Sequence, residues 1–98
     1  MRGFNELIHA PQRLKICAAL APMDELAFQD IRKILDVSDS VLSKHLKQLE
    51  EAGYIAQRKA STLGKKTTWV LLTEEGRTAF NDHVTALRAI VSEHDIQR

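Results

Sequence analysis

The chain has 98 residues, and its fourteen Lys and Arg against thirteen Asp and Glu leave a formal net charge of only +1. An apolar content of 44%, with four glycines and two prolines, excludes disordered, collagen-like and low-complexity chains. This length predicts one small domain over residues 1–98, whose thin core a second subunit would help to bury. Because Cys17 is the single cysteine and no apolar run approaches the roughly 18 residues of a membrane span, we expect a cytoplasmic protein with no disulfide and no membrane partner.

The first third of the chain has helical periodicity with clear interruptions. A helix is predicted over about residues 5–20, and Pro11 can open a second helical piece after a kink because proline lacks an amide hydrogen. Residues 26–28 are long enough only for a very short strand. A brief second helix is predicted over residues 31–35, broken by Val37 and the residue after it.

A third helix is predicted to run to about Ala52. Ser38 is a good N-cap, and Asp39 in the first turn complements the positive end of the helix dipole. Gly53 follows where a left-handed C-terminal cap is favoured.

The two faces of this third helix differ in chemistry. At about 100° per residue, Leu42, Leu46 and Leu49 form one apolar face. Hydroxyl and ammonium groups cluster on the opposite side, from Ser40, Ser43, Lys44 and Lys47. The polar face should point outward on the N-terminal half of the helix, the half that enters a DNA major groove in helix-turn-helix proteins.

A β-hairpin is predicted next, with strands over residues 54–59 and 67–72 and a polar, basic turn over residues 60–66. The charge is uneven along the chain, because residues 43–69 hold six cations against two carboxylates, whereas the rest holds eight against eleven. The near-neutral total therefore conceals a basic half, as expected of a surface that contacts phosphates.

The last predicted helix runs over about residues 74–96, with Thr73 and two glutamates capping and charging its start. Its apolar residues recur at spacings of four, three and four, at Phe80, Val84, Leu87 and Val91. Such a seam suits another helix as its partner.

The motif LSKHLKQLEEAGY at residues 42–54 and the junction LTEEGR at residues 72–77 resemble the winged-helix regulators of the MarR and ArsR groups. The resemblance covers nearly the whole chain. It implies a mainly α fold with a small β-hairpin, comprising a helix-turn-helix (about 29–52), a wing (about 54–72) and a C-terminal dimerisation helix (about 74–96).

The resemblance also implies the function and its residues. It implies a homodimeric, sequence-specific DNA-binding transcriptional regulator acting as a repressor, with double-stranded DNA and a second copy of itself as partners. The recognition positions map onto Asp39, Ser40, Ser43, Lys44 and Lys47, and the wing contacts onto Arg58, Lys59, Lys65 and Lys66. The dimer interface between the first and last helices maps onto Leu7, Phe80, Val84, Leu87 and Val91.

The sequence also bears on catalysis, redox sensing and metal binding. No nucleophile, base and orienting group recur in a catalytic pattern, so we expect no enzyme and no cofactor. Cys17 falls among apolar residues, which favours a buried or dimer-interface thiol over a redox sensor. His83 and His94 resemble part of the zinc site on the last helix of some ArsR-type repressors. Since Asn81 and Gln97 replace the flanking carboxylate or imidazole ligands, we expect no metal there.

Two alternatives remain open from the sequence. The same fold can serve as a protein-interaction module, with the last helix binding a heterologous partner. A regulator of this family can also respond to a metal or a small-molecule effector, whose pocket in so short a chain would lie at the dimer interface.

Overall fold

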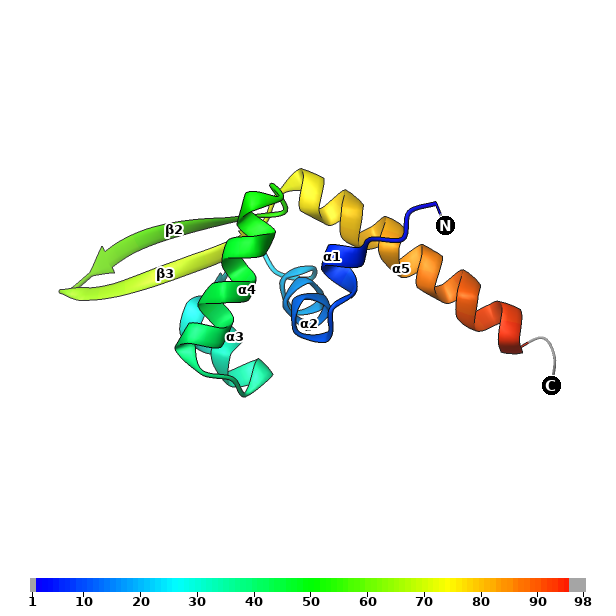
Figure 1. Cartoon of the computed structure of the whole chain (residues 1–98). Coiled ribbons are helices and arrows are strands. Elements are labelled where there is room, and N and C mark those ends of the chain that lie inside the picture. Colours follow the sequence, from blue (N-terminus) through cyan, green and yellow to red (C-terminus); the bar gives the residue numbers. More distant parts are fainter. Residues whose placement is uncertain (1, 96–98) are drawn as a thin grey trace.

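The computed structural model describes the backbone of residues 2–95 and the side chains of residues 2–93. Helices α1 to α4 form a central body, from which a long β-hairpin extends to one side and the final helix to the other, as Figure 1 shows. The principal extents are 57 × 25 × 21 Å. The elements are α1 (Glu6–His9), α2 (Pro11–Leu20), β1 (Leu26–Ala27), α3 (Phe28–Leu35), α4 (Asp39–Glu51), β2 (Ile55–Thr62), β3 (Lys65–Leu72) and α5 (Glu74–Asp95).

The predicted break near Pro11 separates α1 from α2. The side-chain oxygen of Asn5 caps α1 by accepting a hydrogen bond from the Ile8 amide at 2.9 Å. Ala10 has an extended ψ of 131°, and Pro11 then occupies the first position of α2, where its missing amide hydrogen costs nothing. The first helical region therefore makes a corner.

Helix α3 ends at Leu35, as predicted, but it begins at Phe28, three residues before the predicted start, and the residue that breaks it is not Val37 or Ser38. Asp36 adopts the left-handed conformation with φ 55°, and the Val37 amide still donates to the Arg32 carbonyl at 3.3 Å. The reversal therefore occurs one residue earlier, at an aspartate, a residue type that tolerates this conformation better than most. Ser38 instead begins α4, where its hydroxyl accepts from the Val41 amide at 3.2 Å, so its predicted capping role is confirmed.

The end of α4 is a glycine cap, as predicted. Gly53 has φ +82°, its amide donates to the Glu50 carbonyl at 2.9 Å, and the Tyr54 amide donates to the Leu49 carbonyl at 3.0 Å. These two bonds define a Schellman motif, which satisfies carbonyls that the helix leaves unpaired.

The hairpin is longer than predicted, and the expected turn over residues 60–66 is wrong. Ser61 pairs with Lys66 and Thr62 with Lys65, so only Leu63 and Gly64 form the turn. Polar side chains suggested a loop, but a ribbon that projects into solvent carries polar residues on both faces. Strand β1 pairs with the root of β3, giving a three-stranded antiparallel sheet in the order β1-β3-β2.

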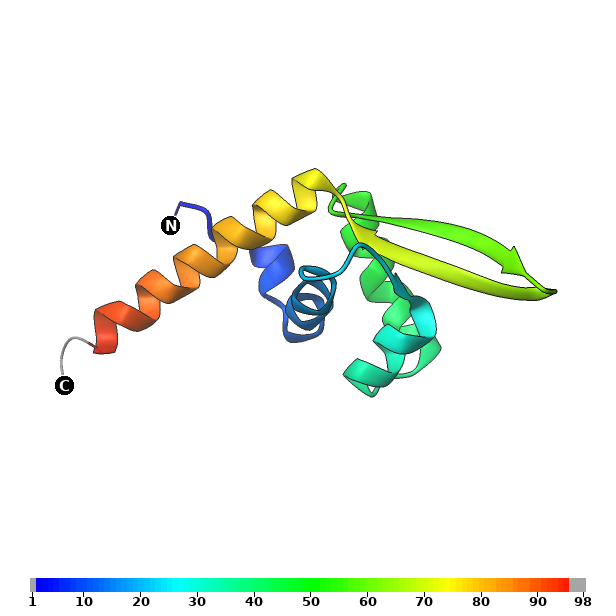
Figure 2. The same ribbon diagram turned by 180° about the vertical axis from the view of Figure 1, so that it is seen from behind.

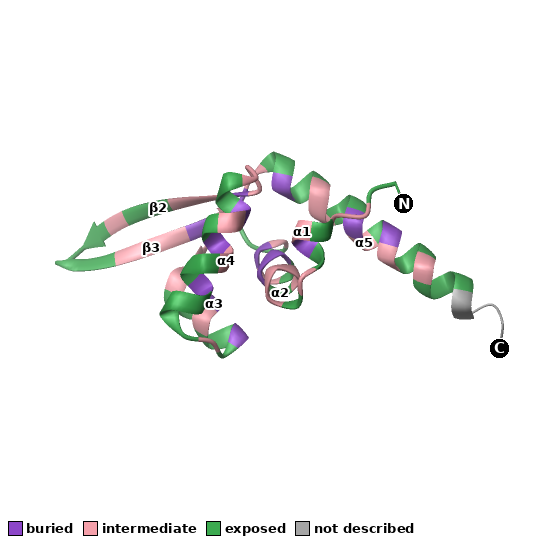
Figure 3. Ribbon diagram, in the orientation of Figure 1, coloured by how far each residue is buried: buried purple, intermediate pink, exposed green. Residues whose placement is uncertain are grey.

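The core lies where α1 to α4 meet the root of the hairpin (Figure 3). Its fully buried apolar side chains are Ile8, Ile16, Cys17, Leu20, Ile31, Leu42, Leu46, Leu49 and Val70. His83, on α5, is also fully buried. The order of the helices and the three-stranded sheet confirm the predicted winged-helix architecture.

Helix α5 begins at a tight junction and then leaves the body. The Thr73 hydroxyl accepts from the Gly76 amide at 2.9 Å and donates to the Gly53 carbonyl at 2.6 Å. The C-terminal half of α5 stands clear of the other elements in both views (Figures 1 and 2). Between residues 2 and 95, no helix has the length and apolar character needed to cross a membrane.

Candidate nucleic-acid interface

The outward face of α4 carries every recognition residue predicted from the sequence. Leu42, Leu46 and Leu49 are fully buried and fix the orientation of the helix on the core. The five predicted residues are all exposed: Asp39, Ser40, Ser43, Lys44 and Lys47. The helix therefore presents two hydroxyls, two ammonium groups and a carboxylate to solvent.

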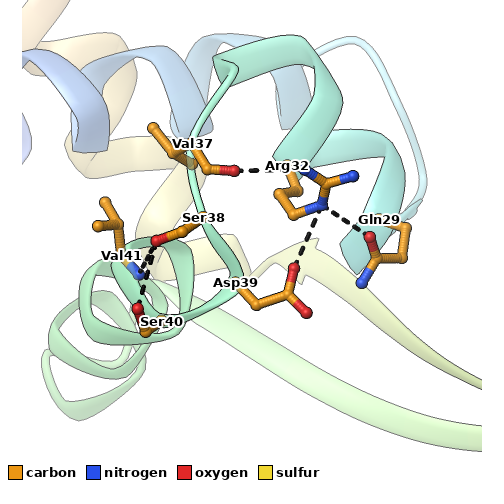
Figure 4. A network of polar contacts seen from close by, with 7 residues as sticks. All are labelled: Gln29, Arg32, Val37, Ser38, Asp39, Ser40 and Val41. Carbon is orange, nitrogen blue, oxygen red and sulfur yellow. Dashed lines mark hydrogen bonds and ion pairs between the residues drawn. The ribbon is translucent and has the colours of Figure 1, made fainter.

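The start of α4 is held by a polar network that spans the turn from α3 (Figure 4). The Arg32 guanidinium donates to Gln29 Oε1 at 2.8 Å through Nε, which also lies 3.2 Å from a carboxylate oxygen of Asp39. The Ser38 and Ser40 hydroxyl oxygens lie 3.2 Å apart. Asp39 thus forms an ion pair within the protein, which bridges the turn between α3 and α4.

Arg13 connects this helix to the N-terminal region, a role that sequence reasoning missed. Its guanidinium donates to the Leu7 carbonyl at 2.6 Å and to Gln48 Oε1 at 2.7 Å, and lies 3.1 Å from His45 Nδ1. One side chain on α2 therefore links α1 to the flank of α4. Because these partners lie up to 35 residues away, no local sequence pattern indicates the contact.

Val41 is a second residue missed from the sequence. It lies 39% exposed on α4, between Ser40 and the buried Leu42 in the chain. At about 100° per residue it falls nearer to Lys44 than to the three buried leucines. The outward face thus includes one methyl-bearing group.

The four predicted wing cations do not form one cluster. The register pairs Lys59 with Thr68 and Ser61 with Lys66, so Lys59 and Lys66 share one face of the ribbon. Arg58 and Lys65 lie on the other face. Arg58 also has partners inside the protein, because one of its nitrogens lies 2.7 and 2.9 Å from the two Glu25 oxygens and its guanidinium lies 5.9 Å from the Trp69 ring centroid.

The structure thus has a capped helix with a polar outer face, followed by a basic hairpin. A comparison with known protein families leads to the same fold. A family model described as a winged helix DNA-binding domain matches residues 12–91. The chain belongs to the winged-helix DNA-binding family.

Similar proteins support the assignment of this winged-helix chain. It is 32% identical over 84 residues to the uncharacterized protein MJ0432 of Methanocaldococcus jannaschii, covering 86% of this chain and 87% of that protein. A transcriptional regulator homologue from Pyrococcus horikoshii OT3 superposes with a TM-score of 0.87 and 26% identity, over 93% of this chain and 90% of that one. A MarR-family regulator from Enterococcus faecalis V583 shares the fold, with a TM-score of 0.75 and 20% identity over 93% and 81% of the two chains. The resemblance to winged-helix transcriptional regulators is confirmed.

The predicted dimer-interface residues of this winged-helix protein fall into two groups. Leu7 and Phe80 are partly buried against the core of their own chain. Val84 and Leu87 are half-buried on α5, and Val91 is 56% exposed. The apolar seam therefore becomes more open toward the end of α5.

Cys17 is fully buried, as one of the two sequence interpretations expected, and burial raises the pKa of its thiol to about 11. A thiol with this pKa holds almost no thiolate at neutral pH, which makes it a poor redox sensor.

His83, a candidate metal ligand, is engaged elsewhere. Its Nδ1 accepts a hydrogen bond from the Asn5 amide at 2.9 Å, and its Nε2 lies 3.2 Å from Nδ1 of His9. In a neutral ring with an accepting Nδ1, Nε2 carries the proton and cannot bind a metal. The side chain of His94 lies outside the described residues. Side chains that the structure does describe include no group of three or more His, Cys, Asp and Glu suited to a metal ion.

Proposed function

We propose that this protein is a sequence-specific transcriptional regulator that binds double-stranded DNA as a homodimer, with α4 in the major groove. One observation carries the proposal. The N-terminal half of α4 presents exposed hydroxyl and ammonium groups above three fully buried leucines. A helix fixed by its apolar face and polar on the other is the form in which helix-turn-helix proteins read base edges.

Among the predicted contacts, Lys44 and Lys47 are the best placed to bind DNA. Both are exposed, and neither has an ion-pair partner among the described side chains. Ser40 and Ser43 add hydroxyls that bind phosphate oxygens or base edges, whereas Asp39 serves mainly to orient the helix through Arg32. The affinity for DNA then depends mainly on Lys44 and Lys47, with Ser40 and Ser43 adding weaker contacts.

The wing supplies phosphate contacts on the flank of the site. Lys59 and Lys66 share a face of the ribbon and both are exposed, and Lys65 lies on the opposite face. Arg58 contributes less, because Glu25 already neutralises it. Since each neutralised phosphate releases counterions, affinity should fall steeply with salt, with a log-log slope of about −0.9 per contact.

The dimer forms through α5 and the N-terminal helices. Val84, Leu87 and Val91 supply an apolar seam, and Leu7 and Phe80 border it. Two copies related by a twofold axis place their α4 helices in successive major grooves, about 34 Å apart, so the target is a pseudo-palindrome. We further propose that the protein is a cytoplasmic repressor and that any small-molecule effector binds where the two subunits meet.

The deciding experiment is selection of bound duplexes from a random-core pool at moderate salt, followed by sequencing. We expect enrichment of an inverted repeat with half-sites about ten base pairs apart. A bound pool without enrichment, with binding lost at physiological salt, would contradict the proposal and favour an interaction module that binds a protein through α5.

A variant pair tests the role of α4 directly. Lys44→Ala with Lys47→Ala should lower affinity for the selected duplex by at least about a hundredfold, because two charged contacts are lost, without changing the melting temperature. Lys15→Ala removes one exposed charge from α2 and serves as the control, with affinity close to wild type. A large fall in melting temperature of the double variant would count against the assignment.

A further inference from the structure

A pair of histidines joins the N-terminal region to α5. His83, on α5, is fully buried, and its Nε2 lies 3.2 Å from Nδ1 of His9, the last residue of α1. Phe4 packs against both rings, with its ring centroid 4.7 Å from that of His83 and 4.8 Å from that of His9. Of these three residues only His9 is exposed. The buried imidazole therefore lies one ring away from solvent.

Asn5 connects this cluster to three elements. Its backbone amide donates to His83 Nδ1 at 2.9 Å, its side-chain oxygen caps α1, and its side-chain nitrogen donates to the Tyr54 hydroxyl at 2.9 Å, beyond the end of α4. A Cβ at Gly3 would lie 3.1 Å from a backbone carbonyl oxygen of α5. The N-terminal strap (residues 2–5) thus lies directly on α5 (Figures 1 and 2).

These hydrogen bonds determine where the ring protons lie. Because a backbone amide can only donate, His83 Nδ1 accepts from Asn5, and Nε2 carries the proton of the neutral ring. That proton points to His9 Nδ1, so His9 accepts there and carries its own proton on Nε2. An additional proton therefore places two donors face to face. On His9 Nδ1 it breaks the bond between the rings, and on His83 Nδ1 it breaks the bond to the strap.

The groups around His83 set the pH at which this happens. Burial and the neighbouring His9 lower the pKa of His83, whereas Glu6 of α1 acts in the opposite direction. Arg13, a cation on α2, directs its guanidinium to the Leu7 carbonyl and to α4. Because the pKa of His83 lies below its ordinary value of about 6.5, the bond to the strap is intact at neutral pH and is lost as the pH falls.

We propose that the His9–His83 pair is a pH-sensitive latch, which holds the N-terminal strap on α5 at neutral pH and releases it when His83 gains a proton. The strap precedes residues 12–91, which match the winged-helix model, and the latch follows from the contacts of this chain alone. Release of the strap does not depend on the proposed function, but its consequence does. Since α5 carries the proposed dimer seam, loosening this helix should lower the affinity of the dimer for DNA.

Nitrogen and proton NMR of the labelled protein tests the latch without DNA. At pH 7.5 we expect both rings of the pair to be neutral with the proton on Nε2. Between pH 7.5 and 5.0 the Asn5 amide proton, which loses its acceptor, should shift upfield together with the titration of His83. A proton on His83 Nδ1 at pH 7.5, or an Asn5 amide that does not respond to pH, would overturn the proposal in the wild type alone.

Two variants assign the transition to the pair. His83→Gln keeps an acceptor but does not titrate, so it should abolish the shift of the Asn5 amide. His45→Gln removes a histidine on α4 instead and should leave that shift unchanged. An Asn5 shift that persists in His83→Gln, or disappears in His45→Gln, would overturn the assignment.

Affinity for the selected duplex at pH 7.5 and 5.0 tests the consequence for DNA binding. Over this range the affinity of the wild type should fall about fivefold relative to that of His83→Gln, a typical size for coupling between two sites. The comparison cancels the charge that the other histidines gain. Equal pH dependence of the two proteins would overturn the regulatory role of the latch. A wild type that selects no duplex at either pH would contradict the proposed function, whereas the NMR result still decides whether the latch exists.

Discussion

His83 shows how a single buried side chain can make stability depend on pH. Its Nδ1 accepts from the Asn5 amide and its Nε2 faces His9, while Phe4 packs edge-on against the ring. Burial lowers the pKa of His83, and the neighbouring His9 lowers it further, although Glu6 acts in the opposite direction. Protonation of Nδ1 would break the bond to Asn5. The native state therefore favours the neutral ring.

The pH dependence follows from this preference. Because the folded pKa lies below the unfolded value of about 6.5, the contribution to stability is complete above that pH and is lost as the pH falls. We expect the wild-type melting temperature to decrease between pH 7.5 and 5.5, and His83→Gln, which keeps an acceptor but does not titrate, to show a smaller decrease. Thermal unfolding at several pH values measures the difference.

The melting temperature of His83→Gln should still decrease somewhat as the pH falls, because burial and Arg13 also lower the pKa of His45. When His45→Gln is combined with His83→Gln, the melting temperature should depend even less on pH. Identical slopes in the wild type and both variants would contradict the assignment of the effect to these histidines.

At the level of single residues, sequence patterns identified the outward side chains well and their partners poorly. Lys44 and Lys47 were predictable because the three leucines opposite them fix the orientation of the helix. The pairing of Arg58 with Glu25, 33 residues away, was not, because only the fold brings them together. The ion pair of Asp39 with Arg32, across the turn between α3 and α4, was likewise not predictable from a local pattern.

At the level of elements, the junction between wing and α5 depends on Gly76. A Cβ at this position would lie 1.9 Å from the Tyr54 carbonyl oxygen and 2.7 Å from the carbonyl carbon. The first turn of α5 therefore passes so close to the chain that leaves α4 that only glycine fits. This contact gives a physical reason for glycine in the LTEEGR junction.

Gly76→Ala should destabilise the fold by about 2–3 kcal/mol, because a backbone segment must move to admit the methyl group. Denaturant unfolding gives the value. Gly64→Ala is the matched control: its Cβ would meet nothing within 4 Å, and only the φ of +79° is unfavourable, at about 1 kcal/mol. A smaller loss for Gly76→Ala than for Gly64→Ala would refute the steric argument.

The order and type of the elements could be predicted, but the start of α3 and the position of the hairpin turn could not. Ser38 and Gly53 mark α4 because capping chemistry is local. The hairpin turn was placed over the seven residues 60–66, most of them polar or glycine, because composition does not distinguish a loop from a solvated ribbon, and only the pairing of Thr62 with Lys65 does. Asp36 ends α3 through its backbone conformation, which no periodic pattern reveals.

At the level of the whole molecule, the chain is elongated because α5 extends beyond the core that the other helices share (Figure 2). Val91 leaves more than half of its surface exposed on this extension. An apolar side chain in that position is consistent with burial against a second copy.

Val91→Asp should weaken the proposed dimer by at least about tenfold, because an unpaired carboxylate would be buried at the proposed interface. Sedimentation at micromolar concentrations should then detect monomer, and affinity for a two-half-site duplex should fall in parallel. Ser92→Asp adds the same charge one residue along, at an exposed position. A mass that stays dimeric in Val91→Asp and falls in Ser92→Asp would place the interface on another face of α5.

The Thr73 hydrogen bonds and the Gly76 contact join the end of α4, the root of the wing and the start of α5 into one stiff unit. In a dimer held by the far end of α5, that helix acts as a lever of about 33 Å. Tilting it by about 10° would move the opposite end by about 6 Å, nearly two base-pair steps. In the proposed dimer, the crossing angle of the two α5 helices would set the distance between the two α4 helices, so a small change in that angle would change which operator spacing the dimer fits.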